Sequence, residues 1–288
     1  MFEHLFSPIK IKSMELKSRA IMPAMGTKFS GNASFVTPTL IEYHKARVRG
    51  GSPLNIVEVC SVHTPSAPRH FLSISDDMYI PGLKQLTDAI HEEGGKAGLQ
   101  LWQGSLCVGM DKTAQILMAS DMEVAPGVTI PGITVEQIKE IVDCYGKAAA
   151  RAVAAGFDCI EFHCAHNYLP HSFLSGGINH RTDEYGGPLG NRMKFPLECI
   201  RAIRANIPED MPLFMRICAM DDYLEGGNTI EDMIVFCKEA KEAGVDVLDV
   251  SRGNVISAGQ KYEVPPVDIP HGFNIENAAR IRKETGML

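Results

Sequence analysis

The sequence of 288 residues predicts an α/β protein with the (β/α)8 fold of a TIM barrel, and two observations carry this prediction. Short apolar and β-branched runs alternate six times with helical patterns, which is typical of a parallel sheet. The long polar loops, at residues 103–133, 164–190 and 252–273, all follow predicted strands. Barrel enzymes build their active sites from the loops at the carboxyl ends of the strands, so this arrangement favours a barrel.

The six predicted strands are short apolar runs bounded by turn residues. A small hairpin around Lys12–Met14 precedes them, and we expect it to plug the bottom of the barrel. The predicted strands are Ala20–Met22, Leu54–Cys60, Lys96–Trp102, Cys159–His163, Leu213–Ile217 and Val247–Val250.

Start and stop signals define the predicted helices. Thr37 is suited to an N-cap and Pro38 to the first helical position, and glycines 50 and 51 end that helix. The pattern from Thr134 to Gln137 is a capping box for a long helix that ends at Gly156. Four more helices are predicted, over Pro81–Glu93, about 191–206, from Thr229 to Gly244, and from an N-cap at Asn274 to Gly286.

A doubly wound open sheet is the competing architecture. It would carry a G-x-G-x-x-G turn after its first strand, whereas the sequence there, Pro23–Thr27, reads PAMGT. By the rhythm of the preceding units, Met287 and Leu288 would begin a seventh strand. We therefore expect residues 1–288 to form one TIM-barrel domain that is truncated after its sixth strand–helix unit, with about two units absent.

Composition narrows the class of protein. A net charge of −7 argues against a nucleic-acid partner and against an anionic membrane surface. The first residues lack the basic and apolar segments of a signal peptide, and no run approaches the roughly 20 apolar residues of a membrane helix. The eight cysteines form no Cys-x-x-Cys pair and indicate buried, reduced thiols. We expect a cytoplasmic protein with no metal site.

The stretch His163-Cys-Ala-His166-Asn-Tyr168 directly follows the fourth predicted strand. Two imidazoles three residues apart, beyond the end of a strand, can converge on one oxygen. A pair of structural, hydrogen-bonded histidines is the alternative. A metal site is disfavoured because no third ligand occurs at a suitable spacing.

Several motifs, spread over the whole chain and in the same order, resemble the old yellow enzyme family of FMN-dependent oxidoreductases. The segment 163–192 is the most specific of them. Within the family, the sequence is most similar to the branch of 2,4-dienoyl-CoA and 2-enoate reductases. The motifs are LFSPIKI at 5–11, PAMGT at 23–27, QLW at 100–102, HCAHNYL at 163–169, FL at 173–174, RTDEYGG at 181–187, NR at 191–192 and MR at 215–216.

This resemblance implies an FMN-binding TIM barrel in which NAD(P)H is the reductant. Hydride passes from NAD(P)H to FMN and then to the β-carbon of an activated C=C bond of an enoate, enone or dienoyl compound. The expected partner is thus a small unsaturated carbonyl substrate. An iron–sulfur cluster and FAD are implied only if a longer natural chain exists, because this branch continues into domains that carry them.

The resemblance also assigns roles to single residues. His163 and His166 match a pair that holds the substrate carbonyl, and Tyr168 matches the proton donor, a role that suits a phenol. Gln100 matches the amide that bonds the flavin edge, and Arg216 matches an arginine near the flavin. Backbone or packing positions along the flavin are matched by Pro23, Ala24, Met25 and Val59.

Other matched residues are read as structural, because opposite charges within a long loop fix its conformation. They are Arg181, Asp183, Glu184, Tyr185, Gly187 and Arg192. The sequence departs from the family after Trp102, where Gln103-Gly-Ser105 lacks the usual arginine. In the family the FMN phosphate is held by the last two barrel units, so we expect residues 1–288 alone to bind FMN weakly.

Two further hypotheses remain. An incomplete, non-catalytic barrel would need a complementing chain or a second copy to close. A non-flavin barrel enzyme such as an aldolase or lyase would need a lysine at the carboxyl end of a strand, and none of the six predicted strands supplies one there.

Overall fold

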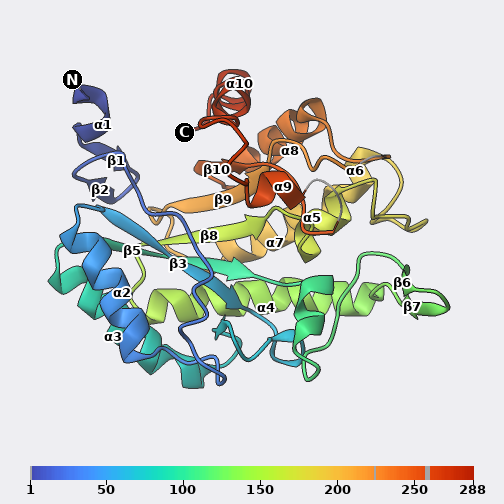
Figure 1. Cartoon of the computed structure of the whole chain (residues 1–288), viewed down its shortest axis with the longest axis horizontal. Helices are drawn as coiled ribbons and strands as arrows, with labels where there is room; N and C mark the ends of the chain where they lie inside the picture. Colours follow the sequence, from blue (N-terminus) through green and yellow to red (C-terminus); the bar gives the residue numbers. More distant parts are fainter. Residues whose placement is uncertain (1, 224, 257–259) are drawn as a thin grey trace.

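A parallel sheet forms the centre of the computed structural model, which describes residues 2–223, 225–256 and 260–288 (Figure 1). Its strands run in the order β10-β9-β8-β5-β3-β4, and every neighbouring pair is parallel. This arrangement confirms the predicted α/β class. The strands are β3 (Leu54–Ser61), β4 (Leu72–Ser73), β5 (Lys96–Trp102), β8 (Cys159–Cys164), β9 (Leu213–Cys218) and β10 (Val247–Ser251).

The prediction of a first strand over Ala20–Met22 is wrong. Only Met22 pairs, as an isolated bridge to Asn55, and two backbone hydrogen bonds of 2.9 Å join it to Leu54 and Ile56. The segment runs along the amino-terminal half of β3, with Ala20 exposed to solvent. One bridge provides too few ladder bonds to extend into a strand.

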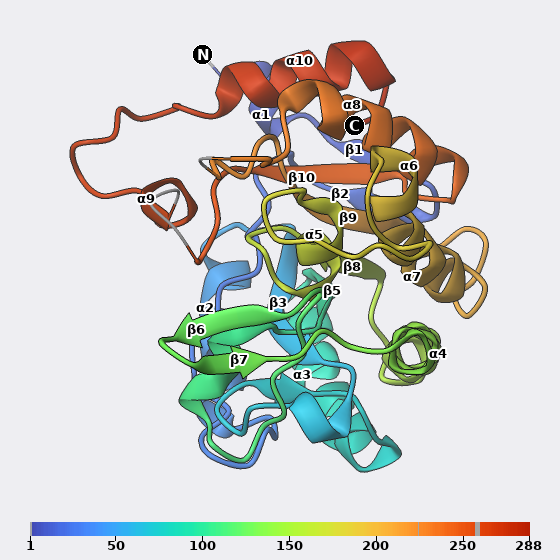
Figure 2. The same ribbon diagram turned by 90° about the vertical axis from the view of Figure 1, so that its right-hand side faces the viewer.

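Six helices cover one face of the sheet and pack on one another in chain order (Figure 2). They confirm the predicted alternation of strands and helices, although the helix expected over 191–206 is split at Met193. The covering helices are α2 (Pro38–Arg49), α3 (Ile80–Glu92), α4 (Val135–Ala154), α7 (Lys194–Arg204), α8 (Ile230–Glu242) and α10 (Ile275–Thr285), and the short helix before α7 is α6 (Leu189–Arg192).

Helix caps form largely as the sequence predicts. The hydroxyl of Thr134 accepts a hydrogen bond from the backbone N–H of Gln137, whose side chain accepts one from the N–H of Thr134. The last helix starts after Asn274 as predicted, but the side chain of Asn274 does not cap it. The amide oxygen of Asn274 accepts from the side chain of Asn277, and its nitrogen donates to the carbonyl of Val250.

The predicted hairpin consists of β1 (Ile9–Ile11) and β2 (Met14–Leu16), with α1 (Glu3–Phe6) before it. The buried side chains of Ile11, Met14 and Leu16 form one cluster with apolar residues at the amino ends of β3, β8 and β9. The backbone N–H of Ser13 donates to the carbonyl of Asp210. The hairpin therefore closes the amino-terminal end of the sheet's open face, as expected for a plug.

The loops after the strands contain elements that the sequence did not predict. The loop after β5 carries the hairpin of β6 (Met122–Ala125) and β7 (Val128–Ile130), and the loop after β8 carries α5 (Leu169–Leu174). The loop after β10 carries α9 (Gln260–Glu263). In the part of the chain that the structure describes, no helix is both long and apolar enough to cross a membrane.

Candidate functional site

A row of polar side chains crosses the face of the sheet that the helices leave uncovered. Alternation along the strands turns every second side chain to this face. Gln100 on β5 is opposite Glu161 on β8, and Arg216 on β9 is opposite Asp249 on β10. Glu58 on β3 shares the face of Leu54 and Ile56, which pack on the plug hairpin.

Glu161 links the row together. Its carboxylate accepts a hydrogen bond of 2.6 Å from the side-chain amide of Gln100, and Arg216 donates to Asp249 over 2.5 Å. Burial, followed by the negative charge of Asp249, raises the pKa of Glu161 to about 8, while Arg216 and Gln100 oppose this rise. The structure thus places both predicted flavin-edge residues, Gln100 and Arg216, in one charged layer.

The predicted catalytic side chains lie together above this layer, at the carboxyl end of β8. The ring of Tyr168 makes edge-on contacts with His163 at 4.8 Å and with His166 at 6.2 Å between ring centroids. The two histidine rings are 5.5 Å apart. Trp102, at the end of β5, stands edge-on to Tyr168 at 5.3 Å.

The backbone between these side chains is unusual. His166 and Asn167 both adopt left-handed φ angles, of 59° and 58°, which non-glycine residues rarely take. The surroundings hold this turn, because the carbonyl of Asn167 accepts hydrogen bonds from the hydroxyls of Ser105 and Ser172. Such conformations persist where the neighbouring structure enforces them and often mark functional turns.

Both histidines are buried and neutral. Burial, and next the adjacent His166, lower the pKa of His163 well below its usual value, and burial followed by Arg216 does the same for His166. The Nε2 atom of His166 is 2.7 Å from the hydroxyl of Ser251 on β10. A neutral imidazole offers one N–H donor and one acceptor, so each ring can hold a carbonyl oxygen without carrying charge.

The remaining predicted cofactor residues border the same face from β3. Pro23 and Met25 are exposed, Met25 by 60%, and Ala24 and Val59 are half-buried. The segment is tied to β3 where the N–H and hydroxyl of Thr27 donate to Glu58. An exposed methionine beside buried polar groups leaves an apolar surface that a flat ring could cover.

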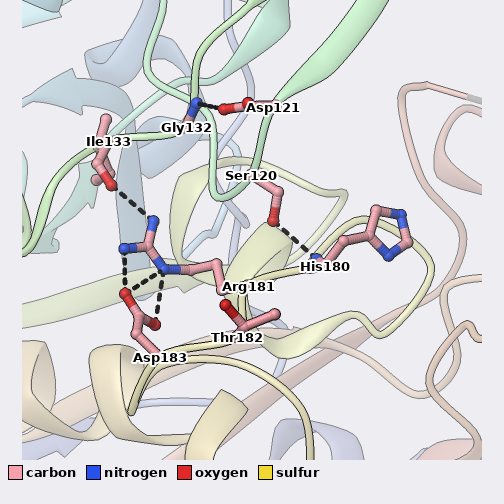
Figure 3. A pocket seen from close by; sticks show the side chains of 8 residues that line it. All are labelled: Ser120, Asp121, Gly132, Ile133, His180, Arg181, Thr182 and Asp183. Carbon is pink, nitrogen blue, oxygen red and sulfur yellow. Dashed lines mark hydrogen bonds and ion pairs between the residues drawn. The ribbon is translucent and has the colours of Figure 1, made fainter.

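Two of the loop residues read as structural, Arg181 and Asp183, line a cavity of about 370 Å³ (Figure 3). The guanidinium of Arg181 is paired with Asp183 and donates to the carbonyls of Ala119 and Ile133. The hydroxyl of Ser120 accepts from the N–H of His180. These contacts fasten the loop after β5 to the loop after β8, and this cavity lies apart from Tyr168 and the two histidines.

Sequence reasoning missed the acidic members of the charged layer and Ser251. Glu161 stands within Cys159–His163 and Asp249 within Val247–Val250, both of which were read simply as apolar strands. A charged residue in the middle of such a run could have indicated these positions. Side chains alternate along a strand, so the charged side chain lies on the opposite face from its apolar neighbours.

Comparison with known proteins identifies the relatives of this chain. The model of the NADH:flavin oxidoreductase / NADH oxidase family matches residues 4–285. An NADH oxidase of Thermoanaerobacter brockii is 36% identical over 98% of this chain, which spans 44% of that protein. An NADPH dehydrogenase of Listeria welshimeri is 37% identical over 98% of this chain, which spans 81% of that protein.

Solved structures agree on the fold. The old yellow enzyme homologue from Zymomonas mobilis superposes with a TM-score of 0.77 at 22% identity, over 98% of this chain and 87% of that one. This likeness supports the TIM-barrel fold predicted from the sequence. By its sequence and its fold, the chain belongs to the NADH:flavin oxidoreductase / NADH oxidase family, as its resemblance to the old yellow enzymes led us to expect.

Proposed function

We propose that residues 1–288 form an FMN-binding barrel domain of an ene-reductase. In this proposal, hydride from NAD(P)H passes through FMN to an activated C=C bond of an enoate, enone or dienoyl compound. The observation that carries it is the position of Tyr168, edge-on to two buried, neutral histidines and above a charged layer with Gln100 and Arg216.

The residues on this face suit a flavin ring. The amide of Gln100 and the guanidinium of Arg216 offer polar contacts from either side of Glu161 in the layer, and the exposed Met25 offers apolar surface. Bound FMN would take up hydride from the nicotinamide and deliver it to the alkene. A cation at Arg216 would favour negative charge on the ring edge near it.

The histidines would bind and polarise the substrate. With N–H donors aimed at the carbonyl oxygen, His163 and His166 would stabilise the negative charge that builds on it when hydride reaches the β-carbon. Because both rings are held neutral by burial, they would donate hydrogen bonds without protonating the oxygen. The hydroxyl of Tyr168 would then supply a proton to the α-carbon.

Replacing Tyr168 by Phe tests this assignment. We expect the rate of flavin reduction by NAD(P)H to stay within about twofold, while alkene reduction falls by about 10²-fold or more, as for loss of a general acid. Rapid-mixing absorbance measurements separate the two half-reactions. Tyr43→Phe, on α2, is the matched control, and unchanged alkene reduction in Tyr168→Phe would remove Tyr168 from the mechanism.

A non-catalytic barrel that closes with a complementing chain or a second copy is the second candidate. It is favoured by an apolar groove of about 330 Å³ between β10 and α10, where Ile275 is 69% exposed and Leu248 donates a backbone hydrogen bond to Leu288. Purified protein that is colourless, takes up no FMN and forms larger assemblies would support this candidate. A bound flavin that NAD(P)H bleaches without oxygen would support the enzyme.

A further inference from the structure

A second polar pocket lies beyond the carboxyl ends of β3 and β5, between the loops that follow these strands. It has a volume of about 340 Å³ and is lined by Asn32, Arg69, His70, Asp111 and Lys112. None of these residues belongs to the charged layer or to the group around Tyr168.

Asp111 gives the pocket a fixed frame. Its carboxylate accepts hydrogen bonds from the backbone N–H and the guanidinium of Arg69, and from the N–H and hydroxyl of Thr113. These bonds, those of Arg69 first, hold the pKa of Asp111 well below its usual range. The side chain of Asp111 is 4% exposed, so its negative charge is compensated by Arg69 and Thr113 within the wall of the pocket.

The surface of the pocket is cationic. Lys112 lines it, and Lys28 is close enough to His70 that its charge, after partial burial, lowers the pKa of that imidazole. Among the residues that the structure describes, the ion pair of this region is Arg69–Asp111, and neither lysine shares it. On a chain whose net charge is −7, the ammonium group of Lys112 thus lines the pocket, and that of Lys28 lies near His70, another of the lining residues.

A line of aromatic rings runs from the pocket to the proposed proton donor. His70 contacts Phe71 at 4.4 Å between centroids, Phe71 contacts Trp102 at 5.4 Å, and Trp102 contacts Tyr168 at 5.3 Å. A group bound in the pocket is therefore separated from Tyr168 by the rings of Phe71 and Trp102 along this line. It is suitably placed to hold the remote end of a long molecule whose reactive end reaches Tyr168.

We propose that this pocket binds the phosphate of a nucleotide-bearing cosubstrate, with Lys28 and Lys112 as the anion-binding residues. The class includes the ribose phosphate of NADPH and that of a CoA thioester, since each separates a phosphate from its reacting carbon by a long linker. Phosphate suits the site because ammonium groups bind its oxygens through charge-assisted hydrogen bonds. The inference rests on the proposed function for its choice of cosubstrate.

Calorimetric titration of the protein with three adenosine phosphates tests the pocket. The probes are adenosine 2′,5′-bisphosphate, which carries the phosphate of NADPH, adenosine 3′,5′-bisphosphate, which carries that of CoA, and 5′-AMP. The double variant Lys28→Gln, Lys112→Gln is compared with Lys139→Gln, Lys238→Gln, which removes two exposed charges from α4 and α8. Both pairs of lysines are exposed, so both variants keep the fold.

We expect the pocket variant to bind one bisphosphate about tenfold more weakly than the control variant does, and to lose most of the salt dependence of that binding. If only the affinity for the 2′,5′ compound falls, the pocket is assigned to NADPH. If only the affinity for the 3′,5′ compound falls, it is assigned to a CoA thioester. Equal affinities of the two variants for all three probes would overturn the proposal. The titration needs no flavin. If the protein binds a bisphosphate but NAD(P)H does not reduce its flavin, the proposed function is contradicted and the proposal for the pocket stands.

Discussion

The carboxyl group of Glu161 is buried in the centre of the molecule, between the amide of Gln100 and the pair formed by Arg216 and Asp249. Burying a carboxylate is costly unless it is paired, and here the cation is shared with a second carboxylate. Its pKa rises first because of this burial and second because of the negative charge of Asp249. Through its hydrogen bond, Glu161 also orients the Gln100 amide with its nitrogen toward the carboxylate.

The first prediction concerns stability and pH. The folded-state pKa of Glu161, about 8, is above the ordinary value of 4.5, so the proton binds more tightly to the folded state. The free energy of unfolding should then fall as pH rises from about 4.5 to 8, by an amount on the order of a few kcal/mol. In Glu161→Gln, which cannot ionise, this part of the decline should disappear.

Urea unfolding between pH 5 and 8.5 measures this slope. Glu239→Gln, an exposed change on α8, is the control and should keep the pH dependence of the original protein. The same slope in Glu161→Gln and in the original protein would show that Glu161 does not titrate in this window.

The residues of the candidate site were predictable to different degrees. The local motif around His163, His166 and Tyr168 is contiguous in sequence, so its members had to lie near one another. Glu161 and Asp249 meet only because β8, β9 and β10 are neighbours in register. That meeting depends on strand order, which a single sequence does not contain.

At the scale of elements, the sequence predicted the features that a few adjacent residues decide. The helices with Thr or Pro at their start begin where expected, because capping is decided by a few adjacent residues. The β6–β7 hairpin was missed because its strands are only four and three residues long and are largely exposed. Asn274 failed as a cap because its amide oxygen, the atom that would cap, accepts a hydrogen bond from the side chain of Asn277 instead.

The second prediction tests the capping box of α4, the longest of the covering helices. Removing the side-chain hydroxyl in Thr134→Ala leaves the N–H of Gln137 without its partner. We expect the free energy of unfolding to fall by about 1 kcal/mol. Thr129→Ala, at an exposed position of β7, should change it by no more than about 0.5 kcal/mol in the same denaturation experiment.

The third prediction tests the plug hairpin. Met14 is 3% exposed and packs with Leu54, Ile56 and Phe214 at the amino end of the sheet. Met14→Ala should lower the free energy of unfolding by about 2 to 4 kcal/mol, since it leaves a cavity in a closed cluster. Met78→Ala, at a side chain that is 59% exposed, is the control. Equal effects of the two changes would mean that the hairpin only lies on the surface.

At the scale of the whole molecule, polarity changes along the open face of the sheet. The plug hairpin makes the amino end apolar, the layer of Gln100, Glu161 and Arg216 is charged, and the histidines and Tyr168 stand at the carboxyl end. In the proposed function, the groups that we assign to flavin binding would contact its ring system. In the family that the sequence resembles, the phosphate of FMN is held by the last two units of the barrel.

The last prediction follows from this separation of the contacts to the flavin ring from the contacts to its phosphate. Riboflavin and FMN differ only in the phosphate, so residues 1–288 should gain nearly the same stability from each. A ligand that binds only the folded state adds about 2.7 kcal/mol at a concentration of 100 times its Kd. Thermal unfolding at matched ligand concentrations should therefore show rises in Tm that agree within about 1 °C. Gln100→Ala should reduce both rises together, because it removes a ring contact. A much larger rise with FMN would instead show that this chain holds the phosphate itself.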